Sequence, residues 1–316
     1  MTEVLISGIV QETELIRRIE LRREDGQPLP PFTAGAHIDV HLPNGLVRQY
    51  SLSNSPRSTQ FYELGIRREA LSRGGSDWIH TARPGERVRI SAPRNLFPLA
   101  DNARRHLLFA AGIGITPIMS MVRSLQAVGG DFEIFYSVQS RKDAAFLFDL
   151  EALKLGAKFK FLADGRHAAM ATINAAISHP VTETHLYVCG PRSYVDTILC
   201  EARQKGWSEK QLHTEAFAPS SSTALSTDNA FTVLLKRSGR RITVTADMTV
   251  AKALELQGVA LPVSCEQGIC GTCLTRVLSG VPEHRDQYLT DEERGLNDQF
   301  TPCCSRSQTP ELILDL

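Results

Sequence analysis

The sequence predicts a multi-domain protein that combines α+β and α/β folds, and three observations predict it. Alternating apolar and polar residues in the first third of the chain indicate an antiparallel β-barrel. Short apolar runs that alternate with helix-compatible stretches then indicate a parallel α/β domain. Near the C-terminus, a hairpin, a short helix and four cysteines are typical of a β-grasp domain. We therefore expect domains over 1–102, 103–218 and 230–316, joined by a polar linker over 219–229.

Composition excludes several classes of protein. The 316 residues, 42% of them hydrophobic, are enough for two or three compact domains. Lys plus Arg equals Asp plus Glu at 35 each, without a basic stripe, so we expect no nucleic-acid partner. The longest apolar run, 107–118, is broken by glycines and Pro117, so we expect no membrane role. The chain begins with Met1-Thr2-Glu3-Val4 and has no leader pattern, which predicts a cytoplasmic protein with reduced thiols.

The expected barrel carries two polar segments. Apolar residues alternate with His37, Asp39 and His41, and the same alternation returns at 88–90 after a Pro-Gly turn. Arg48-Gln49-Tyr50-Ser51 follows the first of these strands. Further on, Arg73-Gly74-Gly75-Ser76 opens a helix-like stretch, where free N–H groups, a hydroxyl and a cation predict a phosphate site. The alternative is an ordinary loop in which Ser76 caps the helix.

Two glycine motifs end strands of the α/β domain. Apolar runs at 106–111, 132–138, 158–163 and 185–189 predict its strands. The first run leads into Gly112-Ile113-Gly114-Ile115-Thr116-Pro117, with Pro117 placed as the first residue of a helix whose N–H groups receive a pyrophosphate. The last run ends in Cys189-Gly190-Pro191. Taken singly, the first motif also fits a tight turn, and Cys189 also fits a small buried residue.

The cysteine spacing predicts an iron–sulfur centre. Cys265-x4-Cys270-x2-Cys273-x29-Cys303 is the plant-type spacing for a [2Fe–2S] cluster, and Gly268 and Gly271 allow the loop between them to curve. Cys304 is an alternative fourth ligand, although it would lengthen the last gap by one residue. Zinc is disfavoured because only one Cys-x2-Cys pair occurs, and a Rieske centre because no Cys-x-His element occurs. An iron–sulfur domain beside the two glycine motifs favours a dinucleotide site over the plain turn.

The cysteine domain is predicted to begin with a hairpin. Alternating apolar residues flank a turn at Ser238-Gly239, and 250–256 has the spacing of a short amphipathic helix. Leu312, Leu314 and Leu316 predict a last strand close to Cys303.

These motifs together resemble the phthalate dioxygenase reductase family, within the ferredoxin–NADP reductase superfamily. Arg-x-Tyr-Ser, Gly-Gly-Ser, Gly-Ile-Gly-Ile-Thr-Pro, Cys-Gly-Pro and the cysteine cluster occur in that order, and the resemblance covers essentially the whole chain. It implies a flavin-binding barrel that holds FMN, an α/β domain that binds NADH, and a C-terminal ferredoxin domain with a [2Fe–2S] cluster.

The resemblance also implies roles for single residues. It places Ser51, Thr116 and Cys189 at the reacting groups, with the Ser51 hydroxyl near flavin N5 and Cys189 near the nicotinamide. The implied cluster ligands are Cys265, Cys270, Cys273 and Cys303. The residues implied to bind the flavin or the nucleotide are Arg48, Tyr50, Ser51, Arg73, Gly74, Gly75, Ser76, Gly112, Gly114, Thr116, Pro117, Cys189, Gly190, Pro191 and Phe217.

The function implied is that of an NADH-dependent oxidoreductase that feeds a separate Rieske-type oxygenase. The oxygenase expected is of the vanillate O-demethylase type, with phthalate, phenoxybenzoate or carnitine oxygenases as alternatives and a ferredoxin-like carrier without enzymatic activity as a further one. A flavin is needed because NADH gives two electrons at once and the cluster accepts one. Ser140-Arg141-Lys142-Asp143 contains two basic residues, so sequence electrostatics alone also allow NADPH. We expect a monomer.

Overall fold

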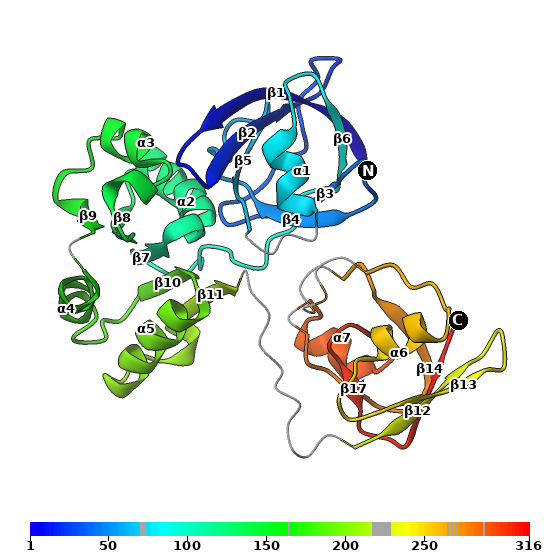
Figure 1. The fold of residues 1–316 in the computed structure, drawn as a ribbon. Coiled ribbons are helices and arrows are strands. Elements are labelled where there is room, and N and C mark those ends of the chain that lie inside the picture. The colour runs from blue at the N-terminus through cyan, green and yellow to red at the C-terminus, as the bar shows by residue number, and fades with distance from the viewer. Residues whose placement is uncertain are drawn as a thin grey trace. The chain divides into compact units, whose positions relative to one another are not determined.

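The computed structural model describes residues 1–69, 74–163, 165–216, 229–263, 266, 268, 271–286 and 288–316. The chain forms two compact units, Met1–Phe217 and Ala218–Leu316 (Figure 1). The expected linker, 219–229, lies outside the described residues except for Asn229.

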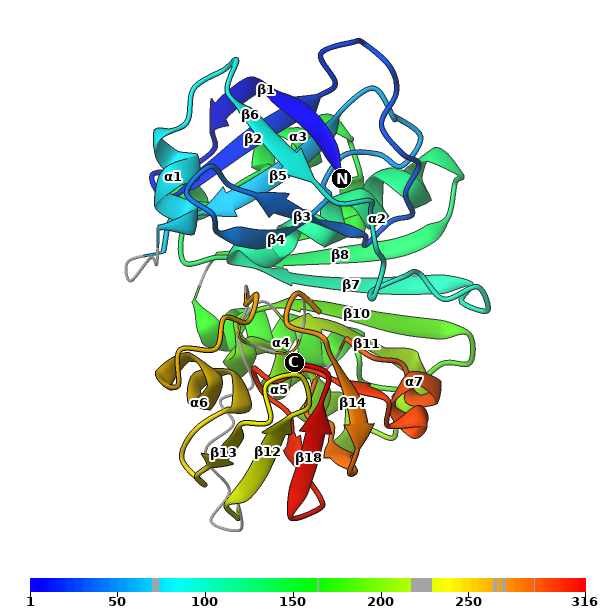
Figure 2. The ribbon, with the colours of Figure 1, turned by 90° about the vertical axis from the view of Figure 1, so that its right-hand side faces the viewer.

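Six antiparallel strands form the first sheet of the larger unit, in the order β4-β3-β6-β1-β2-β5. An isolated bridge between Leu52, which follows β4, and Leu64 in β5 brings the two ends of the sheet together, so the strands close into a barrel. We call this part, with helix α1, the barrel; it is the blue and cyan part of Figure 2. Its elements are β1 (Thr2–Gln11), β2 (Ile16–Arg22), β3 (His37–His41), β4 (Val47–Ser51), β5 (Tyr62–Arg67), α1 (Gly75–Thr81) and β6 (Arg87–Ile90).

Strand β3 is buried on both faces, which its sequence did not predict. Ile38 and Val40 face the barrel core, but His37 and Asp39 are also buried. The cause is the segment after β6, where Arg94 pairs with the backbone of His37 and donates to Asp39 Oδ2 at 2.9 Å. A charged partner from another segment therefore replaces the water that an alternating strand normally meets.

Five parallel strands form the second sheet, in the order β11-β10-β7-β8-β9. We call this part the α/β lobe. Its strands are β7 (Arg105–Ala111), β8 (Asp131–Ser137), β9 (Phe159–Leu162), β10 (Thr184–Gly190) and β11 (Leu212–Ala216). The parallel sheet and the first four strands are as predicted. The edge strand β11 has no long apolar run and was not predicted.

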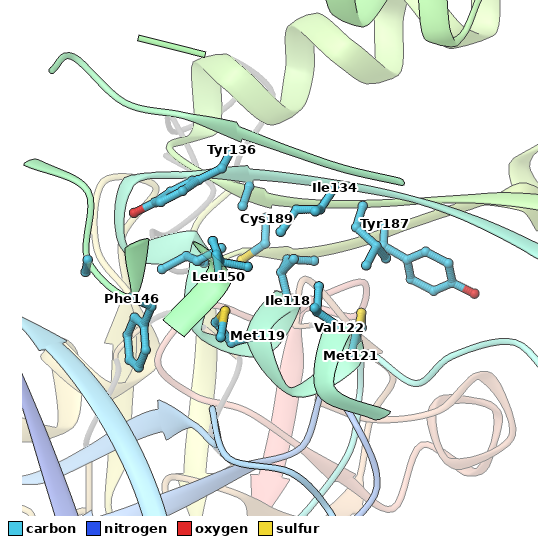
Figure 3. Close-up of a cluster of buried hydrophobic side chains, with 14 of the residues drawn as sticks. Ile118, Met119, Met121, Val122, Ile134, Tyr136, Phe146, Leu150, Tyr187 and Cys189 are labelled. Atoms are coloured by element: carbon cyan, nitrogen blue, oxygen red, sulfur yellow. The ribbon is translucent and has the colours of Figure 1, made fainter. Parts of the chain in front are cut away.

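Helices cover both faces of the parallel sheet. Their bounds are α2 (Ile115–Ala127), α3 (Leu147–Ala152), α4 (Arg166–Ala176) and α5 (Arg192–Gln204). Helices α2 and α3 share a core with Tyr136, Tyr187 and Cys189 (Figure 3), whereas α4 and α5 pack on the opposite face. Pro117 is the third residue of α2 rather than the first, because a 3₁₀ turn over Gly112–Gly114 leads directly into the helix. It still lies in the first turn, where a missing N–H costs no helical bond.

The strand order creates a switch point beside β7. The chain runs from β7 outward through β8 to β9, and then returns to β10 on the other side of β7. In open α/β sheets, ligands bind at the carboxyl ends of strands at such a point. Those ends carry Gly112 and Gly190.

The smaller unit has the β-grasp arrangement that the sequence predicts. Its main sheet has the order β13-β12-β18-β14-β16, with β12 and β18 parallel. The hairpin, the helix α6 and the last strand β18 all form. Its elements are β12 (Phe231–Leu235), β13 (Arg241–Val244), α6 (Val250–Leu256), β14 (Thr275–Ser279), β15 (Pro282–Glu283), α7 (Asp291–Leu296), β16 (Gln299–Phe300), β17 (Arg306–Ser307) and β18 (Glu311–Leu314).

Within the described parts of both units, every helix is too short or too polar to cross a membrane.

Candidate functional site

Arg48 packs against the turn that opens α1. Gly74 has φ 96°, and a Cβ on Gly75 would lie 2.7 Å from Arg48 Nε, so a larger residue at 75 would have to displace the Arg48 side chain. The Ser76 hydroxyl accepts a hydrogen bond from the Glu69 amide at 3.1 Å. Four of the five residues predicted to bind a phosphate are thus brought together. The fifth, Arg73, lies outside the described residues.

Ser51, at the end of β4, contacts a carboxyl group that sequence reasoning did not single out. Its Oγ donates to Glu215 Oε2 at 3.1 Å, and His37 Nδ1 lies 3.8 Å from Glu215 Oε1. Burial raises the pKa of Glu215 to about 7, although the Ser51 hydrogen bond opposes this shift. Burial and the nearby Arg94 lower the pKa of His37 to about 4, so its imidazole is neutral at pH 7. This corner of the molecule can therefore hold a carboxyl proton near neutral pH.

The remaining barrel residue of the predicted site, Tyr50, precedes Ser51 on β4, where burial raises the pKa of its phenol far above the usual value. The phenol therefore stays neutral at any physiological pH.

The two glycine motifs of the α/β lobe touch each other at the switch point. A Cβ on Gly114 would lie 2.3 Å from the carbonyl oxygen of Cys189, and one on Gly190 would lie 2.9 Å from Ala111 Cβ. Gly112 has φ 53°, in the left-handed region. The loops after β7 and β10 can therefore approach only because both carry glycine.

Cys189 and Thr116 are both buried beside these loops. Cys189 is fully buried, and burial raises the pKa of its thiol well above the usual value, so it is a neutral thiol at pH 7 (Figure 3). The Thr116 hydroxyl donates to the Ile113 carbonyl at 3.0 Å, which ties the first turn of α2 to the preceding 3₁₀ turn. Pro117 is buried next to it.

A cavity of about 620 Å³ opens at the carboxyl ends of these strands. Gly112, Pro191 and Tyr194 line it from the α/β lobe, and Thr13–Ile16 and Arg67 line it from the barrel. This volume suits a cofactor-sized ligand. The cavity contains residues from both glycine motifs, as the sequence predicts for a dinucleotide site.

The expected cluster site lies in the smaller unit. Cys273 precedes β14 and Cys303 lies between β16 and β17, and both are buried. Gly268 and Gly271 have φ 70° and 66°, which gives the loop the curvature expected around a cluster. Cys265 and Cys270 lie outside the described residues, as does Phe217 of the flavin site.

Comparisons with known proteins agree with this geometry. Residues 233–308 match the family model for a 2Fe-2S iron-sulfur cluster binding domain, and residues 89–212 match the N-terminal domain of dimethylamine monooxygenase subunit DmmA-like proteins. A vanillate O-demethylase oxidoreductase from a Pseudomonas species is 46% identical over the full length of both chains. The solved structure of phthalate dioxygenase reductase is 35% identical, with a TM-score of 0.74 over 99% of this chain and 97% of that one. The chain belongs to the phthalate dioxygenase reductase family.

Other relatives place this family member among reductase components of oxygenases. The phenoxybenzoate dioxygenase subunit beta of Ectopseudomonas oleovorans is 40% identical. The match covers 98% of this chain and 96% of that subunit. The carnitine monooxygenase reductase subunit of Escherichia coli is 37% identical, and the match covers 100% of this chain and 98% of that subunit. These comparisons confirm the predicted fold class and the prediction of an oxidoreductase that serves an oxygenase.

Glu215 and His37 lie beside Ser51, and the sequence analysis assigned neither of them to the site. Glu215 precedes Phe217 by two residues and was not itself considered, and His37 was noted only as a polar residue in an alternating strand. The sequence carries no signal that marks Glu215, because β11 itself was not predicted and the burial of this carboxyl becomes visible only in the tertiary structure.

Proposed function

We propose that this protein is the NADH-dependent reductase component of a vanillate O-demethylase, and that it passes electrons through FMN and a [2Fe–2S] cluster to a separate Rieske-type oxygenase. The observation that carries the proposal is the meeting of Ser51, Glu215 and Cys189 where the barrel joins the α/β lobe. Ser51 bonds Glu215, and Glu215 pairs in register with Cys189 across β11 and β10. A flavin at this place supplies the conversion of a hydride into single electrons.

The barrel residues bind and orient the flavin in this proposal. Arg48 and Arg73 supply positive charge to the FMN phosphate, and Gly74, Gly75 and Ser76 supply backbone and hydroxyl groups. Tyr50 and Ser51 would line the flavin ring, and Phe217 matches the aromatic position that meets the flavin in the family. The pairing of Arg48 with the Gly74–Gly75 turn supports this assignment because it places the guanidinium beside those backbone amides.

The α/β lobe residues bind NADH. Gly112, Gly114, Thr116 and Pro117 form the turn that receives the pyrophosphate, while Cys189, Gly190 and Pro191 lie at the nicotinamide end. At pH 7 the thiol of Cys189 and the imidazole of His37 are uncharged, so Glu215 is the group among these three whose charge changes near neutral pH. Glu215 Oε2 accepts a hydrogen bond from the Ser51 hydroxyl and so orients that hydroxyl. The chain thus contributes positioning and the exclusion of water rather than an acid or base with a strong charge.

One contact bears on the choice between NADH and NADPH. Arg141 donates to Glu151 at 2.5 Å, and its guanidinium lies 5.9 Å from the centre of the Phe161 ring. Arg141 therefore already has an acidic partner, but this pair is exposed and weak, so the choice of NADH rests on the family resemblance. Equal or better use of NADPH at equal concentration would contradict this preference.

The cluster ligands in this proposal are Cys265, Cys270, Cys273 and Cys303. The buried position of Cys303 and the left-handed glycines of the loop support the set. We place the protein in the cytoplasm, where thiols remain reduced, and expect a monomer, which light scattering of the purified protein tests.

The test of the function is NADH-dependent formaldehyde release from vanillate with a vanillate oxygenase component and omission controls. Release that needs both proteins supports the proposal. If NADH reduces the protein but vanillate is untouched, the partner is another Rieske oxygenase, and phenoxybenzoate and carnitine oxygenases are the next to assay, since relatives of both kinds were found. A protein purified without flavin would instead favour a ferredoxin-like carrier.

A further inference from the structure

Glu12 of the barrel bonds the α/β lobe through one carboxylate oxygen and Arg18 of the barrel through the other. It follows the last residue of β1, and its side chain is 9% exposed. Oε2 accepts a hydrogen bond from the Phe146 amide at 2.7 Å, and Oε1 lies 2.9 Å from Arg18 Nε. The turn between β1 and β2 is thus bonded to the chain that enters α3.

Phe146 has a strained backbone that its surroundings hold in place. Its φ is 59°, a value that costs an L-residue on the order of 1–2 kcal/mol. A Cβ on Gly65 of the barrel would lie 2.8 Å from the Phe146 ring, so the two pack closely, and the Arg18 guanidinium lies 5.3 Å from the centre of the ring. Strain of this kind persists only where several contacts determine it together, and it gathers at functional sites.

An ion network extends this junction. Arg18 Nη1 lies 2.9 Å from Asp149 Oδ2 and 3.3 Å from Glu63 Oε2. Arg123 of α2 completes the ring, since it donates to Glu63 Oε1 at 2.6 Å and to Asp149 Oδ1 at 2.9 Å. All four side chains are 13–25% exposed, so solvent screens these pairs less than surface pairs. Charges from both parts alternate in this network, which therefore resists their separation.

The two chain segments that Glu12 joins continue into opposite walls of the cavity. Thr13–Ile16 follow Glu12 and form the barrel wall, and Asp143 precedes Phe146 by three residues on the wall of the α/β lobe. Glu12 and Phe146 are not among the described residues that line the cavity. The hydrogen bond between Glu12 and the Phe146 amide therefore ties together the segments from which both walls of the cavity continue.

We propose that Glu12 is a positioning residue that sets the width of the nucleotide cavity through its bond to the Phe146 amide. The inference rests on the proposed use of this cavity by NADH. Because Glu12 acts at the walls and not at the Ser51–Glu215 corner, its loss weakens NADH binding more than it slows hydride transfer. The contribution of a preorganised loop is to reduce the cost of ordering it when the ligand binds.

The test uses the full-length protein with its flavin and cluster, and compares E12A and E12Q. Stopped-flow bleaching of the flavin by NADH gives the half-saturating concentration and the limiting rate separately. Titration calorimetry with ADP-ribose, which has no nicotinamide, gives binding without any redox step. E24A is the matched control, because Glu24 forms an ion pair with Arg87 on the barrel surface and both side chains are exposed to solvent.

We expect E12A to raise the half-saturating NADH concentration and the dissociation constant of ADP-ribose about tenfold, with the limiting rate changed less than threefold. E12Q keeps one oxygen for the Phe146 amide but turns its NH2 group toward Arg18 Nε, so we expect a smaller loss of affinity than in E12A, and we expect E24A to equal the wild type. Unchanged affinities in E12A overturn the proposal, as does an E12Q protein as defective as E12A. If E12A does not fold, the proposal is tested by comparing E12Q with the wild type in NADH reduction and in ADP-ribose binding. Wild-type protein that NADH cannot reduce would refute the proposed function instead, whereas a loss confined to the variants concerns Glu12.

Discussion

Ser51 in β4 of the barrel donates a hydrogen bond of 3.1 Å to Glu215 in β11 of the α/β lobe, although 164 residues separate them in the chain. The bond joins the proposed flavin site to the edge of the parallel sheet. It also fixes the hydroxyl in a direction that neither strand would impose alone. The first predictions concern this pair.

Replacing Ser51 with alanine removes the hydroxyl and leaves the Glu215 carboxyl without its donor. We expect S51A to reduce the limiting rate of flavin bleaching by NADH about 10- to 100-fold, because small displacements of reacting groups have effects of that size. The half-saturating NADH concentration should change little, since Ser51 is not at the cavity wall. Stopped-flow absorbance measures both, and S7A, which changes an exposed serine of barrel strand β1, is the control. An unchanged limiting rate in S51A would exclude a role in hydride transfer.

Glu215 predicts a pH dependence of stability with a definite sign. Its pKa is about 7 in the folded protein, above the ordinary value of 4.5, so the folded state retains this proton more strongly than the unfolded state. The stabilisation that the Glu215 proton gives the folded state is fully present below pH 4.5. It is lost as the pH rises to 7, and the free energy of unfolding falls by roughly 3 kcal/mol. E215Q cannot ionise. The difference in unfolding free energy between E215Q and wild type, measured with urea from pH 4.5 to 8, should therefore grow in favour of E215Q and level off above pH 7. A constant difference would show that the carboxyl has an ordinary pKa.

The contact between Gly114 and Cys189 predicts a contrast between two neighbouring glycines. A methyl group at position 114 would meet the Cys189 carbonyl oxygen at 2.3 Å, whereas one at Gly112 would meet no atom within 4 Å but would suffer from φ 53°. We expect G114A to separate the loops, abolish NADH binding and destabilise the larger unit by more than about 2 kcal/mol. G112A should cost only about 1 kcal/mol. Urea unfolding and NADH titration of both variants provide the measurement, and equal effects would contradict the close approach.

Replacing cysteine with serine is expected to have opposite effects on the cluster at the adjacent positions 303 and 304. Cys303 is buried, and Cys304 lies with its Sγ 3.3 Å from Thr301 Oγ1 and near Gly268 of the cluster loop. We expect C303S to lose or strongly alter the visible and electron paramagnetic resonance spectra of the cluster. C304S should keep a plant-type spectrum and the full iron content. The reverse pattern would assign Cys304 as the fourth ligand.

Local patterns in the sequence were sufficient for much of the fold. Strand β10 is an apolar run between a turn and a Gly-Pro, so the predicted 185–189 lies within one residue of its observed bounds. The hairpin around Ser238-Gly239 was equally plain, because turn residues separate two alternating segments. Strand β11 was missed because an edge strand needs only one buried face and has no long apolar run. The burial of Asp39 was missed because its partner, Arg94, is 55 residues away.

By itself, the sequence determined the chemistry that the chain can support. Cysteine spacing, the glycine turns and the Arg48 to Ser51 segment are local, and each restricts its own neighbourhood through bond geometry and backbone freedom. The tertiary structure alone decided which of these groups meet. The raised pKa of Glu215, its bond to Ser51 and the bond of Glu12 to the Phe146 amide all arise where the barrel packs against the α/β lobe. Their physical basis is the exclusion of water at that junction, a property of packing that no single segment contains.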